Sequence, residues 1–163
     1  MFAGRMGRNI AVILAIALAG TGCWYSFTDK PYPDIRTVGV IPFDNRTTEY
    51  EIPTLATEYL TQKLASGSAY SLAEPQSADA VLSGEITAYR VEVNTYDEQE
   101  NQIDYIVRVR ATVIFKNRLT GKQIWSQAFE GHATFPADGD EESAKTEAVR
   151  MLVDRIYDKL KSG

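Results

Sequence analysis

The stretch Tyr105–Lys116, with the sequence YIVRVRATVIFK, decides the fold. Its odd-numbered positions carry only apolar or aromatic side chains, whereas most even-numbered positions carry charged or polar ones. Because successive side chains of a strand point to opposite faces, this period of two predicts a strand with one buried face. The two predicted faces are Tyr105, Val107, Val109, Ala111, Val113 and Phe115 on one side, and Ile106, Arg108, Arg110, Thr112, Ile114 and Lys116 on the other.

Further strands are predicted on both sides of this stretch. Thr120-Gly121-Lys122 is typical of a hairpin loop, after which Ile124–Phe135 returns as a strand. Upstream, residues 80–93 are rich in β-branched side chains, and residues 37–43 form a shorter apolar run that ends in Pro-Phe. Within residues 80–93 the apolar positions change phase, which predicts a bulge or a strong bend near Ala88 and Tyr89. Simple alternation assigns Leu82, Gly84, Ile86 and Ala88 to one face, and Tyr89, Val91 and Val93 to the other.

Two segments have the period of an amphipathic helix. The first starts near Pro53 and stops at Gly67; the second covers Glu141–Lys161, with acidic residues at its start and basic residues at its end. Each helix can bury its apolar stripe against one face of a sheet. The order of elements therefore predicts an α+β fold: a two-layer sandwich of two helices packed on one face of a mostly antiparallel four-stranded sheet.

The N-terminus has a composition of its own. Arg5 and Arg8 precede the uncharged run Ile10–Ala19, which is followed by small residues, and this is the pattern of a secretory signal peptide. The run is shorter than the roughly 20 apolar residues that a spanning helix needs, so an uncleaved membrane anchor is the less favoured alternative.

Cys23, the sole cysteine, stands where the signal pattern ends and has no partner for an internal disulfide. The stretch Ala19–Cys23 resembles a bacterial lipobox, although Gly20 stands where leucine is usual. This resemblance implies a covalent diacylglycerol and an N-acyl chain on Cys23, and no other cofactor is expected. Trp24, in place of aspartate, implies by the same resemblance an anchor in the outer membrane. A small buried cysteine is the alternative.

These features divide the chain into a lipoprotein signal peptide (residues 1–22), a lipidated N-terminal tether (23–36) and an α+β domain (37–163). Residues 1–22 hold two of the 17 basic residues and none of the 22 acidic ones, so the mature chain has a net charge of −7. Such a charge argues against a nucleic-acid partner. An acidic mature chain should also be repelled by anionic membrane surfaces, so something other than a basic patch must hold the chain if it sits at a membrane.

The sequence offers no catalytic or metal-binding constellation. His132 is the only histidine, and without a second imidazole or thiol in the mature chain a zinc site of the His/Cys type is excluded. The acidic run that begins at Asp138 lacks the spacing of a calcium loop and predicts a helix start instead. We therefore expect no metal and no enzymatic activity.

One face of the predicted strand Tyr105–Lys116 carries three cations, Arg108, Arg110 and Lys116, interleaved with Ile106 and Ile114. Such a face is either a solvated outer surface or a surface that meets a phosphorylated amphiphile, because guanidinium groups bind phosphate in a planar, bidentate manner.

Four segments, in this order and spacing, resemble the lipopolysaccharide-assembly lipoproteins of the LptE-like family. They are Gly22–Phe27 (GCWYSF), Ile35–Thr47 (IRTVGVIPFDNRT), Ala78–Ile86 (ADAVLSGEI) and Leu119–Trp125 (LTGKQIW). The resemblance implies two helices on a four-stranded sheet and a lipid-anchored position on the periplasmic face of the outer membrane. It implies a non-enzymatic plug and assembly partner of a large β-barrel translocon that inserts lipopolysaccharide into the outer leaflet. Arg108, Arg110 and Lys116 are then candidate lipopolysaccharide contacts. A different interaction lipoprotein of the outer membrane, such as a secretion-pore component, is the alternative.

Overall fold

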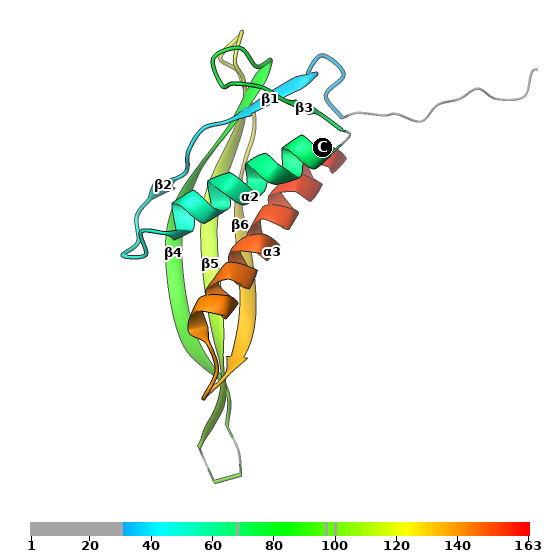
Figure 1. Cartoon of the computed structure of the whole chain (residues 1–163). Helices are drawn as coiled ribbons and strands as arrows, with labels where there is room; N and C mark the ends of the chain where they lie inside the picture. Colours follow the sequence, from blue (N-terminus) through cyan, green and yellow to red (C-terminus); the bar gives the residue numbers. More distant parts are fainter. Residues whose placement is uncertain (1–30, 68, 97, 100) are drawn as a thin grey trace, which may run out of the picture.

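The computed structural model describes residues 31–163 except 68, 97 and 100, so the predicted signal peptide and Cys23 lie outside the described residues. Two helices lie side by side on one face of a long, twisted sheet (Figure 1). In chain order the elements are β1 (Thr37–Val40), β2 (Asp44–Asn45), α2 (Ile52–Ser66), β3 (Ser71–Leu72), β4 (Ala80–Tyr96), β5 (Gln102–Asn117), β6 (Gln123–Pro136) and α3 (Glu141–Ser162).

The predicted two-layer α+β architecture is confirmed, but the sheet is larger and more mixed than the sequence indicated. It has six strands in the order β3-β1-β4-β5-β6, with β2 pairing to β4. The antiparallel prediction holds for β4, β5 and β6. The short strands β1, β2 and β3 pair in parallel instead, and β2 and β3 make the sheet larger than the four strands predicted. Parallel neighbours require a crossover connection, and α2 supplies it between β1 and β3. The two-residue strands β2 and β3 are too short for a period to reveal them.

β5 lies between β4 and β6, and its predicted inner face is confirmed. Val107, Val109, Ala111, Val113 and Phe115 are all fully buried beneath the helices. The predicted bulge in β4 is also present: Ile86 pairs with Ala111 and Ala88 with Arg110, so Thr87 is the additional residue. The bulge places Tyr89 and Val91 on the same face as Ile86, and Ala88 on the opposite one. The prediction that Ala88 shares a face with Leu82 and Ile86 is therefore wrong.

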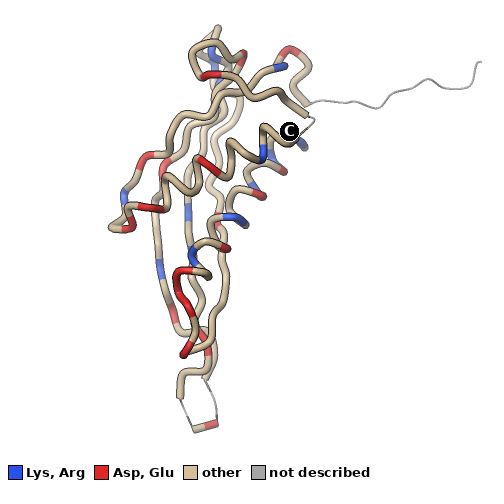
Figure 2. Tube along the Cα trace, in the orientation of Figure 1, with Lys and Arg blue, Asp and Glu red and all other residues tan. Residues whose placement is uncertain are grey.

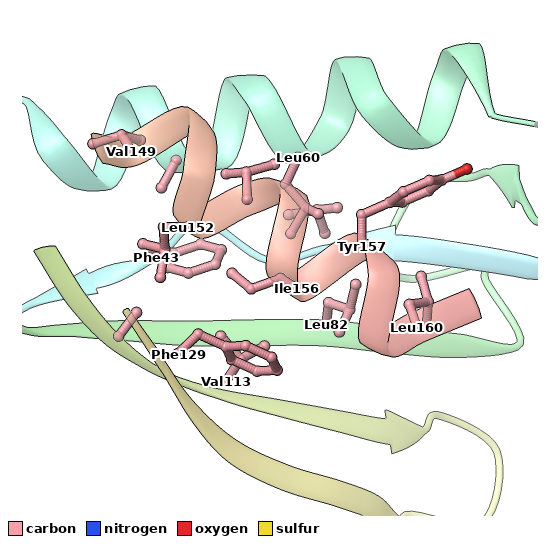
Figure 3. Close-up of a cluster of buried hydrophobic side chains, with 14 of the residues drawn as sticks. Phe43, Leu60, Leu82, Val113, Phe129, Val149, Leu152, Ile156, Tyr157 and Leu160 are labelled. Carbon is pink, nitrogen blue, oxygen red and sulfur yellow. The ribbon is translucent and has the colours of Figure 1, made fainter. Parts of the chain in front are cut away.

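Helix α3 packs closely on the edge strand β6. At Gly131 the helix backbone comes so near that an added Cβ would collide with the carbonyl oxygen of Ala148 and the amide nitrogen of Leu152. The Asp140 carboxylate caps the helix by accepting a hydrogen bond from the Glu142 amide (3.0 Å). Below the helix, Leu152, Ile156 and Leu160 are fully buried against the sheet (Figure 3). Neither described helix has the length and apolar character that crossing a membrane requires.

Packing extends upstream of Thr37. Ile35 is buried, and the ring of Tyr32 lies 5.4 Å from that of Phe115. Asp79 fixes the entry to β1, because its carboxylate accepts hydrogen bonds from the amides of Arg36 and Thr37, each at 2.9 Å. These charge-assisted hydrogen bonds join the segments around residues 36 and 79, which the sequence separates widely.

Candidate functional site

The face of the sheet opposite the helices carries the candidate site. On β4, β5 and β6 the alternation that buries one set of residues points the other set to this open face. Cross-strand register brings Arg90 opposite Arg108, and Arg110 opposite Glu130. Figure 2 shows basic positions along the middle of these strands. The site residues are Arg90, Glu92, Arg108, Arg110 and Glu130, and we call them the arginine cluster.

Glu130 holds two of the arginines in place. Arg110 donates to one carboxylate oxygen at 2.6 Å and Arg108 to the other at 3.1 Å. Arg108 also lies 3.7 Å from the carboxylate of Glu92. The hydrogen bond from Arg110, followed by the one from Arg108, outweighs burial and lowers the pKa of Glu130. Glu130 therefore stays ionised at neutral pH, and the cluster contains three guanidinium groups and two carboxylates.

Lys116 lies apart from this cluster. It is eight residues from Arg108 along β5, or about 27 Å at the rise of an extended strand. It pairs with Gln123 beside the β5–β6 turn. The three cations that the sequence predicted thus share a face but form two separate groups.

Arg90 belongs to the cluster, but sequence reasoning missed it. Counting by twos from Leu82 assigns Arg90 to the buried face, whereas the bulge at Thr87 moves it to the open one. The change of phase in residues 80–93 was the signal that could have identified it. Arg90 is exposed, and it forms no ion pair with any other residue that the structure describes.

The arginine cluster forms a contact surface and not a deep pocket. The hollow that it surrounds measures about 50 Å³, enough for only a few water molecules. Exposed side chains around a shallow hollow can contact a phosphate group of a larger molecule, but they cannot enclose a small substrate.

His132 and the acidic run, which the sequence pointed out, contact other parts of the fold, and so does Lys145, which the sequence did not point out. His132 pairs with Arg108 across the β5–β6 ladder. Asp140, in the acidic run, caps α3. Lys145 is almost fully buried and donates to Glu49 at 3.2 Å and Glu142 at 2.7 Å. Within residues 31–163 as described, no group of three or more histidine, cysteine or acidic side chains is arranged to hold a metal ion.

Together, the half-covered sheet and its charged open face define a two-layer α+β domain with an exposed charged surface. The chain belongs to the LptE family, described as lipopolysaccharide-assembly, whose profile matches residues 35–160. The family prediction is therefore confirmed. No curated protein matches the chain.

Solved structures share the fold at low sequence identity. A variant PelC dodecamer from Paraburkholderia phytofirmans has a TM-score of 0.56 and 18% identity, covering 78% of this chain and 90% of that one. The hypothetical protein CT253 from Chlamydia trachomatis has a TM-score of 0.55 and 12% identity, covering 77% and 93%. Protein XCC0632 from Xanthomonas campestris has a TM-score of 0.53 and 8% identity, covering 78% and 82%.

Proposed function

We propose that the protein is a non-catalytic outer-membrane lipoprotein that acts as plug and assembly partner of a β-barrel translocon, which inserts lipopolysaccharide into the outer leaflet. The observation that carries this proposal is the match of residues 35–160 to a lipopolysaccharide-assembly family. The shallow open face, which suits contact with a large partner better than turnover of a small substrate, supports it.

Depletion of the protein tests this role. Loss of the assembly partner should reduce lipopolysaccharide at the cell surface, and the native protein should purify with a very large outer-membrane barrel in a one-to-one complex. Normal surface lipopolysaccharide after depletion would contradict the proposal. A homo-oligomeric ring on sizing, without a barrel, would favour the alternative of a secretion-pore component.

Cys23 is proposed to carry the diacylglycerol and N-acyl chains that hold the protein at the periplasmic face of the outer membrane. Two or more acyl chains give stable anchoring, because each buried CH₂ contributes about 0.8 kcal/mol. Mass analysis of the processed N-terminus should find both modifications. Cys23→Ala should release the protein from the membrane fraction; retention of this variant would contradict the anchor.

We propose that Arg108, Arg110 and Lys116 contact the phosphate groups of lipopolysaccharide, and the register adds Arg90 to this set. Since Glu130 already bonds Arg108 and Arg110, an incoming phosphate must compete with its carboxylate or bind the guanidinium edges that remain. Because Lys116 lies apart from the arginine cluster, we expect lipopolysaccharide to bind mainly at the cluster and to contact Lys116 more weakly.

Changing Arg108, Arg110 and Lys116 together to alanine should weaken lipopolysaccharide binding, with most of the loss reproduced by the Arg108/Arg110 pair. The matched control is Arg150→Ala with Lys161→Ala, which removes exposed cations from α3 on the other side of the molecule. Unchanged binding by a folded triple variant would exclude these residues as the contact.

A further inference from the structure

The β5–β6 turn and its flanks are basic, although the mature chain is acidic. From Tyr105 to Phe129 the sequence contains five lysine and arginine residues and no aspartate or glutamate. Three of these cations, Lys116, Arg118 and Lys122, are exposed around the turn. We call residues 116–122 the basic turn.

The basic turn has a fixed shape that presents a leucine to solvent. The Asn117 amide donates to the Lys122 carbonyl at 2.9 Å, and the Thr120 amide donates to the Asn117 side chain at the same distance. Gly121 takes the left-handed conformation (φ 71°) that closes the turn. Leu119 at its tip is 72% exposed. A single exposed leucine is ordinary, but a leucine surrounded by three cations combines the two features that favour a membrane interface.

The basic turn lies at the end of the domain that the tether enters. Tyr32 contacts Phe115, which is two residues before Asn117. Cys23 precedes Tyr32 by nine residues, and a fully extended chain of that length spans at most about 32 Å. Figure 1 shows the described chain beginning near this end, whereas the β4–β5 hairpin projects from the opposite one. An anchor on Cys23 therefore keeps Tyr32, at this end of the domain, within about 32 Å of the leaflet that holds the acyl chains.

The neighbouring charges are compatible with an anionic surface. The acidic residue bonded to the basic turn is Asp79, whose carbonyl accepts from the Arg118 amide at 2.9 Å. Its carboxylate is directed to the amides of Arg36 and Thr37, and these hydrogen bonds lower its pKa. Figure 2 shows acidic positions at both ends of the domain, in loops near the basic turn and at the start of α3 on the opposite end.

We propose that the basic turn docks on the anionic phospholipid surface of the leaflet in which the Cys23 acyl chains sit. Leu119 enters the interface, and Lys116 and Lys122 contact headgroup phosphates. Arg118, whose Nε donates to the Ala78 carbonyl at 2.5 Å, adds positive charge beside them. The inference rests on the proposed lipid anchor and adds an orientation to it. Local charge and not the net charge of −7 decides how the domain meets the membrane, and the β4–β5 hairpin points away from that leaflet.

The test is a comparison of depth at two sites of the acylated mature chain. With Cys23 blocked by its acyl chain, Leu119→Cys provides one site for an environment-sensitive NBD label. Tyr50→Cys, at an 85% exposed position before α2, is the matched control. In vesicles of phosphatidylcholine with phosphatidylglycerol, the label at 119 should shift its emission to the blue and be quenched by lipid-borne quenchers. The label at 50 should remain accessible to aqueous iodide.

Charge dependence provides the second measurement. Lys116→Gln and Lys122→Gln should each lower the ratio of inserted to water-exposed label at 119 by roughly fivefold at low salt. Vesicles of phosphatidylcholine alone should reduce insertion to a similar extent as the two substitutions together.

The outcomes separate the turn from the anchor. Equal iodide access at 119 and 50 in a chain whose acylation is verified by mass overturns the docking proposal and keeps the anchor. If mass analysis finds Cys23 unmodified, the anchor is overturned. Cys23 then takes label equally in both variants, so a difference between positions 119 and 50 that remains still supports docking of the basic turn. An unmodified chain without any difference overturns both.

Discussion

The two faces of β5 differ in almost every property, although they alternate along one strand. Toward the helices, Val107 to Phe115 are fully buried at every second position. On the open face, Arg108 and Arg110 keep 40% and 58% of their side-chain surface exposed and bond to Glu130. The covered face provides the stability of the domain, whereas the open face leaves charged groups available for contacts and contributes little to stability. Four predictions break or sharpen this contrast.

The largest difference is expected between two adjacent residues. Phe115→Ala empties a fully buried site and should lower the free energy of unfolding by about 4 kcal/mol. Lys116→Ala, one position further and exposed, should change it by less than about 0.5 kcal/mol. Urea unfolding of the two variants measures both values, and similar losses would contradict the assignment of faces.

A smaller loss is expected where the covered face meets α3. Gly131→Ala places a Cβ against the backbone of Ala148 and Leu152, which cannot yield as a flexible side chain could. Overpacking of this kind should cost about 2–3 kcal/mol. His132→Ala, on the opposite face of β6, is the control and should be nearly neutral. Thermal unfolding measures the stability of both variants. A Gly131→Ala variant as stable as His132→Ala would contradict the close approach of α3 to β6.

An ion pair at the edge of the covered layer should matter less. Lys145→Met leaves Glu49 and Glu142 without their cation, and since both acids are partly exposed we expect a loss of about 1–2 kcal/mol. Burial alone would lower the pKa of Lys145, but the hydrogen bonds that it donates to Glu142 and Glu49 outweigh burial and raise the pKa. This stability is present below the unfolded pKa near 10.5 and disappears as pH rises through the folded value. A wild-type advantage that persists at strongly alkaline pH would contradict the ion-pair explanation.

The smallest effect is expected on the open face. The pKa of Glu130 is lowered, so its stabilising contribution is present above the unfolded pKa near 4.5 and is lost as pH falls through the folded value. Because its arginine partners are largely exposed, Glu130→Gln should cost only about 0.5 kcal/mol at pH 7 and less at pH 3. Chemical unfolding at the two pH values measures the difference, and an equal cost at both would exclude the charge as its origin.

Much of the fold was predictable because long amphipathic helices and strands show the period of their secondary structure in the spacing of their apolar residues. Helices α2 and α3 fall where the pattern placed them, and β5 has the faces that its alternation indicated. The short parallel strands were not predictable, since two paired residues have no period and their pairing depends on a crossover. For the candidate site, the sequence identified Arg108 and Arg110 but not Arg90, because the bulge at Thr87 inverts the faces beyond it.

By itself the sequence determined the two-layer architecture and the residues of each face of β5, because alternation and helical period are local properties of the chain. Its motifs indicated the family by resemblance. Only the tertiary structure decided which distant residues meet. Cross-strand register placed Glu130 between Arg108 and Arg110, separated Lys116 from them, and brought Tyr32 against Phe115 beside the basic turn. Register and packing sum interactions over the whole sheet and core, and no single segment contains that information.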